Sequence, residues 1–132
     1  MIALAQEAFT DRRQLSGPAL RTFFNIAEKW RLGTEAQMKL LGVSARSTYY
    51  KWKKDGNVCL PRDTLERISY ILGIFKALQI LFPGEAADAW INKPNSARPF
   101  LGRSALEYML SGNVADLYVV RRYLDAQRGG WA

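Results

Sequence analysis

Cationic and hydroxyl side chains are concentrated in residues 46–54, and proteins use these groups to bind nucleic acids. Lysine and arginine neutralise phosphates, while arginine and hydroxyl groups also form hydrogen bonds with the edges of bases. We predict a helix here, with Arg46 and Ser47 near its start, where DNA-reading helices usually reach the bases. The side chains predicted to contact DNA are Arg46, Ser47, Thr48, Tyr50, Lys51, Lys53 and Lys54.

A first short helix is predicted just before this segment. Thr34, followed three residues later by Gln37, is typical of a helix N-cap, in which a hydroxyl accepts a backbone hydrogen bond. Met38 and Leu41 then lie on one face of the helix. Gly42 is expected to end it, because glycine accepts the positive φ of a C-terminal turn.

The second helix follows the turn, and Ser44 is its expected cap. Tyr49 and Trp52 are three residues apart, which predicts that both face inward. Their role would then be structural, and truncating either side chain would lower the stability of the fold. A helix, a glycine-containing turn and a cationic helix are typical of a helix-turn-helix that binds DNA. The alternative is an ordinary helical hairpin in a basic protein.

The charge distribution favours the DNA-binding interpretation. The chain of 132 residues has a net charge of +7. Residues 1–54 hold ten Lys/Arg and four Asp/Glu, so +6 of that charge lies in the segment with the predicted helix-turn-helix. Contacts with DNA phosphates require such a concentration of cations.

The composition disfavours an enzyme. The chain contains no histidine and one cysteine, Cys59, so neither an internal disulfide nor a zinc site of the usual ligands can form. Nucleophilic and metal-dependent catalysis lack their common groups, and we expect no cofactor. The N-terminus lacks a basic start, and no stretch approaches ~20 apolar residues. We therefore expect a cytoplasmic protein without a signal peptide or membrane span.

The first firm helix is predicted to start at Gly17-Pro18, with proline early in the helix, and to run to about Arg31. Residues 1–15 allow two alternatives, a short helix or a loose arm that brings Arg12 and Arg13 near DNA. The inward stripe of the helix consists of Leu20, Phe23, Phe24, Ala27 and Trp30.

A further helix is predicted to begin at Pro61 to Asp63 and to break or bend at Gly73. The apolar run Ile74 to Phe82 then forms a second helix, which is either core of the monomer or a dimer interface. The same position separates a predicted DNA-binding domain, residues 1–72, from a helical domain, residues 73–132. The inward set of the first helix is Leu65, Ile68, Ile71 and Leu72.

The second half also reads as helical, which makes the predicted fold class all-α. Residues 85–91 predict a short helix, and residues 92–99 predict a loop anchored by Phe100-Leu101-Gly102. Ser104 and Glu107 form a capping box for the next helix. The last helix is predicted from Val114 to about Gln127, with Leu117, Val120 and Leu124 inside.

A set of residues in the second half forms a recognisable pattern: Trp90, Pro94, Asn95, Phe100, Gly102, Ser104, Leu106, Gly112 and Leu124. In the order of these residues the second half resembles the C-terminal toxin-binding domain of the Xre/MbcA/ParS antitoxins. One departure is Ala105, where proline is expected after the serine.

The resemblance implies an all-α antitoxin with an N-terminal helix-turn-helix and two activities. It implies binding to a partner toxin, commonly one with a RES fold that consumes NAD or transfers ADP-ribose. It also implies repression of its own operon through operator DNA, often as a homodimer. Toxin contacts are then expected around Asn95, Arg98, Phe100 and Arg103.

The C-terminal tail is a second candidate contact with the toxin. Gly129 and Gly130 form a hinge that can deliver Trp131 into a concavity, and tryptophan is a common interface anchor. The alternative is that Trp131 folds back on the last helix or stays disordered. Arg121, Arg122 and Arg128 would add donors for carboxylates of the toxin or for a toxin pocket that normally receives phosphates.

Two functions therefore remain open from the sequence. One is an antitoxin that neutralises a toxin and regulates its own operon. The other is a transcriptional regulator that acts alone and whose C-terminal half only dimerises or senses a ligand. An adjacent reading frame that encodes a toxin would favour the first.

Overall fold

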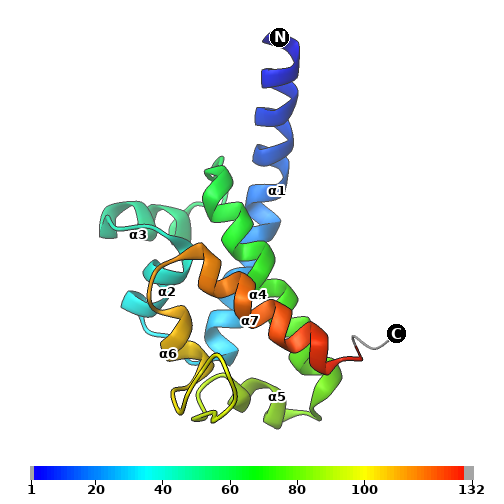
Figure 1. Ribbon diagram of the computed structural model, residues 1–132. Coiled ribbons are helices and arrows are strands. Elements are labelled where there is room, and N and C mark those ends of the chain that lie inside the picture. The colour runs from blue at the N-terminus through cyan, green and yellow to red at the C-terminus, as the bar shows by residue number, and fades with distance from the viewer. Residues whose placement is uncertain (1, 130–132) are drawn as a thin grey trace.

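The computed structural model describes residues 2–129 of the chain, and this part contains seven α-helices (Figure 1). Between residues 2 and 129 there is no β-strand, only an isolated bridge between Pro94 and Ser104. The predicted all-α class is confirmed. The helices are α1 (Ile2–Lys29), α2 (Thr34–Leu41), α3 (Arg46–Lys54), α4 (Arg62–Leu81), α5 (Glu85–Trp90), α6 (Ala105–Met109) and α7 (Val114–Gln127).

Helix α4 is the central element of the fold, because it packs against α1, α2, α5 and α7 (Figure 1). Its inner face is mostly apolar and removed from water, and burial of apolar surface is the main favourable contribution to folding. Within residues 2–129 no helix is both long enough and apolar enough to cross a bilayer. The buried aliphatic residues of α4 are Ile68, Ile71, Ile74, Ala77 and Leu78.

The predicted break at Gly73 is wrong, since α4 continues through it from Arg62 to Leu81. Glycine weakens a helix but does not end one when both flanks are buried. Gly73 instead allows a close approach by the last helix. A Cβ atom at this position would lie 2.4 Å from the Cζ atom of Arg121 on α7. The predicted second helix is thus the C-terminal part of α4, and its buried members Ile74 and Leu78 belong to the monomer core.

The predicted start of the first helix at Gly17-Pro18 is also wrong. Helix α1 begins at Ile2 and includes Pro18 in its interior, and its N-terminal turns project from the rest of the molecule (Figure 1). Of the two alternatives for the N-terminal residues, the structure has the helix. Tertiary contacts offset the backbone hydrogen bond lost at proline. The buried Ser16 Oγ accepts a hydrogen bond from the Leu60 amide at 2.8 Å and donates one to the Arg12 carbonyl at 2.5 Å.

Gly42 ends α2 as predicted, with φ of 74° in the left-handed region. The N-caps predicted for α2 and α3 are wrong. Gly33 and Ala45 occupy the N-cap positions of α2 and α3, and neither makes a side-chain capping bond. Thr34 is the first residue of α2, and Ser44 lies in the turn outside α3.

The helices of the second half follow the sequence pattern closely. Helix α7 has the predicted bounds, and its expected inner residues Leu117, Val120 and Leu124 are buried. The predicted cap at Ser104 is confirmed, because its Oγ atom accepts from the Glu107 backbone amide at 3.0 Å, and the Glu107 carboxylate in turn accepts from the Ser104 hydroxyl at 3.4 Å. Ala105, where the resemblance predicted proline, is the first residue of α6 and is buried.

Candidate DNA-binding and partner-binding surfaces

Helix α3 has one buried aromatic face and one exposed polar face. Tyr49 is fully buried and Trp52 is 9% exposed, which confirms their predicted inward orientation. Thr48 is half-buried. The other residues predicted to contact DNA are exposed, and their contact with DNA stays a prediction. They are Arg46, Ser47, Tyr50, Lys51, Lys53 and Lys54.

A buried polar chain fixes α3 to α2. The Tyr49 hydroxyl donates to Gln37 Oε1 at 2.6 Å, and Gln37 Nε2 donates to the Leu32 carbonyl at 2.8 Å. Gln37 is 8% exposed and satisfies both partners inside the protein. The sequence analysis assigned Gln37 to the N-cap of α2 because it lies three residues after Thr34. That local spacing holds no information about a partner on α3, so the bond to Tyr49 was missed.

The cations of α3 differ in their surroundings. Arg46 forms an ion pair with Glu35 of α2, and both side chains are more than half exposed. Such an exposed pair contributes ~0–1 kcal/mol, so Arg46 can leave it for DNA. Lys53 lies over the Tyr49 ring, with its Nζ atom 5.9 Å from the ring centroid. Among the described residues, no carboxylate forms an ion pair with Lys51, Lys53 or Lys54.

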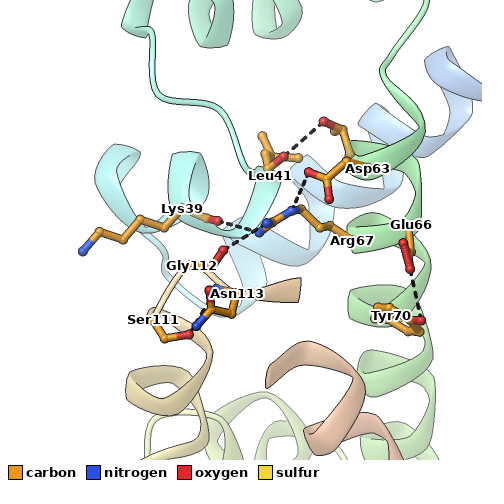
Figure 2. Close-up of polar contacts among 10 residues, drawn as sticks. Lys39, Leu41, Asp63, Glu66, Arg67, Tyr70, Ser111, Gly112 and Asn113 are labelled. Atoms are coloured by element: carbon orange, nitrogen blue, oxygen red, sulfur yellow. Dashed lines mark hydrogen bonds and ion pairs between the residues drawn. The ribbon is translucent and has the colours of Figure 1, made fainter. Parts of the chain in front are cut away.

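Arg67 of α4 joins the helix-turn-helix to the second half of the chain (Figure 2). Its Nη1 atom donates to the Lys39 carbonyl in α2 at 3.3 Å, and its Nη2 atom donates to the Gly112 carbonyl at 3.0 Å. Its Nε atom pairs with Asp63 at 2.8 Å. A Cβ atom at Gly42 would lie 2.6 Å from Arg67 Nε, so the guanidinium also requires glycine at the end of α2.

The loop between α5 and α6 is anchored by an aromatic cluster. Phe100 is fully buried, and its ring centroid lies 5.9 Å from that of Trp90, 5.2 Å from that of Tyr123 and 5.8 Å from that of Tyr108. Edge-to-face ring pairs of this kind contribute stabilisation beyond that of the area that the rings bury. Phe100 is therefore a structural anchor of the predicted toxin-binding loop. The Asn95 amide pairs with the Arg103 carbonyl at 3.0 Å across the loop.

The rest of the predicted anchor differs from expectation. Leu101 does not fill the core, because its side chain is 73% exposed.

The two arginines predicted to contact the toxin, Arg98 and Arg103, are also exposed. The guanidinium of Arg103 lies over the Tyr108 ring, 5.6 Å from the ring centroid. Burial raises the pKa of the Tyr108 hydroxyl, and the Asp116 carboxylate raises this pKa further.

The arginines of the C-terminal region lie on or just after α7, away from the loop in sequence. Arg121 packs on Gly73 and donates to the Ser69 carbonyl at 3.4 Å. Arg122 donates to the Tyr118 hydroxyl at 3.1 Å, and Arg128 forms an ion pair with Asp125 at 3.9 Å. The predicted hinge starts at Gly129, which has φ of 107°. Gly130 and Trp131 lie outside the described residues.

Comparison with known proteins gives each half of the chain a match. Residues 10–73 match the family described as the antitoxin Xre-like helix-turn-helix domain. Residues 77–130 match the antitoxin Xre/MbcA/ParS C-terminal toxin-binding domain. The chain is 58% identical over 112 residues to an uncharacterised protein, y4oB, of Sinorhizobium fredii, and the match covers 84% of each chain. No solved structure matches the chain.

The fold and these surfaces define a two-part helical protein, with a helix-turn-helix and a partner-binding half that share α4. The chain belongs to the Xre/MbcA/ParS antitoxin family, and it is the antitoxin of a toxin-antitoxin system. The resemblance drawn from the second half of the sequence is confirmed.

Proposed function

We propose that this antitoxin neutralises a RES-type toxin that consumes NAD or transfers ADP-ribose, and that it represses its own operon. The observation that carries the proposal is the union of two surfaces on one chain. A helix-turn-helix with an exposed cationic helix is joined through Arg67 and α4 to a toxin-binding domain. Both activities take place in the cytoplasm, where the operon and its products are found.

The DNA-binding part of the proposal rests on α3. Its exposed Arg46, Lys51, Lys53 and Lys54 form a surface suited to phosphates and base edges. A single helix of nine residues reads only a few base pairs. We therefore propose a homodimer on the operator, in which two copies of α3 enter successive major grooves and read two half-sites.

The toxin-binding part rests on the loop between α5 and α6 and on the chain that follows α7. The loop is braced by backbone hydrogen bonds and carries the exposed cations Arg98 and Arg103, with Asn95 half-buried beside them in the loop. We propose that the segment starting at Gly129 adds to this contact and that Trp131 enters the cleft of the toxin. Tryptophan buries a large area at low rotamer cost, which makes it an effective anchor.

A transcriptional regulator that acts alone is the second candidate function. One observation favours it, a mainly apolar cavity of about 440 Å³ between α1, α4 and Arg121. Its lining includes Leu15, Ala19, Ile68 and Leu72, and a small apolar ligand would fit such a surface. In this alternative the second half would dimerise, or would sense through Arg121 a ligand held mainly by α1 and the first half of α4, and it would bind no toxin.

Expression of the adjacent reading frame separates the two candidates. We expect that frame to be lethal alone, harmless with this chain, and recoverable as a complex on purification. A truncated variant that lacks residues 127–132 tests the role of the tail. We expect this variant to neutralise the toxin less well and, as a free protein, to bind the operator as before. Harmless expression of the adjacent frame by itself, with operator binding intact, would favour the regulator.

A further inference from the structure

Leu101 is a large apolar side chain held out in solvent. At 73% exposed, it is the most exposed large hydrophobic residue among residues 11–129, whose side chains the structure describes. Its backbone has φ of 54°, in the left-handed region that leucine rarely adopts because its Cβ atom crowds the following carbonyl. Exposure and backbone strain therefore occur together at one residue, and backbone strain clusters at active sites and ligand-binding sites.

The conformation is fixed by the surrounding loop. The Leu101 amide donates to the Ala97 carbonyl at 3.1 Å. The Gly102 amide donates to the Asn95 carbonyl at 2.7 Å, and the Asn95 amide donates to the Arg103 carbonyl at 3.0 Å. These bonds hold both ends of the turn, so Leu101 has a defined position above the loop.

The buried neighbour of Leu101 adds to this rigidity. Phe100 is fully buried among Trp90, Tyr108 and Tyr123, and it immobilises the backbone immediately before Leu101. A side chain that is already positioned loses little conformational entropy on binding, which is the physical basis of preorganised interface anchors.

The electrostatic surroundings indicate the chemistry of the partner. Lys93, Arg98 and Arg103 are exposed on the same loop region, and residues 89–106 contain no Asp or Glu. An exposed apolar side chain on a loop whose charged residues are all cations is complementary to an apolar pocket bordered by carboxylates. This arrangement gives specificity and faster association as well as contact area.

We infer that Leu101 is a central anchor of the toxin interface and inserts into an apolar, acid-rimmed pocket of the toxin. The inference rests on the proposed toxin-binding function and assigns its contact to a particular residue. The sequence interpretation placed toxin contact around Phe100 but treated Leu101 as part of the loop's internal anchor. The structure separates the two roles, with Phe100 holding the loop and Leu101 facing outward.

Two substitutions separate binding from folding. Leu101→Asn removes the apolar surface, and asparagine tolerates the left-handed conformation, so the loop geometry is retained. Leu101→Gly removes the side chain and the strain together. Leu15→Asn on α1 is the matched control, because Leu15 is also a largely exposed leucine, at 59%.

The experiment titrates the wild-type chain and each variant into the protein encoded by the adjacent reading frame, isolated from the co-expressed complex. We expect Kd to rise by about thirtyfold for both Leu101 variants, the change that truncation of an interface anchor produces. We expect Leu15→Asn to bind like wild type. The Tm of Leu101→Asn should match wild type, and that of Leu101→Gly should be equal or higher because the strain is relieved.

The outcomes distinguish this inference from the proposed function. If wild type does not bind the adjacent protein, the proposed function and the role of Leu101 both fail. If wild type binds tightly and both Leu101 variants bind within threefold of it, only the role of Leu101 is overturned. Equal weakening by Leu15→Asn would also overturn it, because the effect would then not be local to the loop.

Discussion

The Nη2 atom of Arg67 donates to the carbonyl oxygen of Gly112 at 3.0 Å, across 45 residues of sequence (Figure 2). The same guanidinium donates to the Lys39 carbonyl at the end of α2. One side chain therefore satisfies a carbonyl in the helix-turn-helix and a carbonyl in the turn that starts α7. Because Arg67 is 9% exposed, water has limited access to replace these bonds.

Replacing Arg67 with methionine should lower the free energy of unfolding by about 2–4 kcal/mol, because two poorly hydrated carbonyls lose their donor. Methionine retains much of the volume, so the loss reports the hydrogen bonds more than a cavity. Urea unfolding of the full chain measures the change. Arg62→Met in the exposed first turn of the same helix is the control and should change stability by less than ~0.5 kcal/mol. Equal effects of the two variants would contradict a linking role for Arg67.

Replacing Tyr49 with phenylalanine should cost about 1–2 kcal/mol of stability, since the buried Gln37 Oε1 atom loses its donor. The ring stays in place, so the change isolates the hydroxyl. Tyr50→Phe on the same helix is the matched control, because Tyr50 is 51% exposed and its hydroxyl is accessible to water. Thermal unfolding of both variants measures the effect. A Tyr49 variant as stable as the Tyr50 variant would show that the polar chain through Gln37 adds nothing.

Local patterns predicted much of this fold from the sequence. The stripe Leu117, Val120 and Leu124 gave α7 its bounds, and Ser104 with Glu107 gave the start of α6. Both signals lie within a few residues of the structure that they specify, and no distant contact opposes them. The inward positions of Tyr49 and Trp52 followed from helical spacing for the same reason.

The features that sequence reasoning missed depend on contacts between distant residues. Pro18 and Gly73 are local signals for a helix boundary, yet packing of α1 and α4 overrides both. Lys39 and Gly112 lie 28 and 45 residues from Arg67, and Tyr49 lies 12 residues from Gln37, so these partners are beyond the reach of any periodic pattern. The outward position of Leu101 depends on the turn that the loop forms around it.

The close approach of Gly73 and Arg121 leads to a third prediction. Alanine at an exposed helix position usually stabilises by about 1 kcal/mol relative to glycine. In wild type, Gly73→Ala must displace the Arg121 guanidinium and its bond to the Ser69 carbonyl, which offsets that gain. We therefore expect the stabilisation by Gly73→Ala to be larger by ~0.5–1 kcal/mol in an Arg121→Ala background. A double-mutant cycle by urea unfolding measures this coupling, and additive effects would contradict the close approach.

The lysines at the end of α3 lead to the last prediction. Lys53 and Lys54 are exposed, and no carboxylate among the described residues forms an ion pair with them. If they contact phosphates, replacing both with alanine removes attraction that does not depend on base sequence. Operator binding and binding to unrelated DNA should then weaken by similar factors. The slope of log K against log salt concentration should also become shallower by about one for each lysine.

A control with the same net charge separates contact from general attraction. Lys76→Ala with Lys93→Ala removes two exposed lysines outside α3 and gives the same total charge as the α3 variant. We expect this control to keep most of the salt slope, because long-range attraction is screened beyond ~10 Å at 0.1 M salt. Arg46→Ala should behave differently from both, with a loss of about 1–3 kcal/mol confined to the operator if it pairs with a guanine. Equal loss of slope in the two double-lysine variants would mean that α3 does not lie against the phosphates and that the DNA surface must be sought elsewhere.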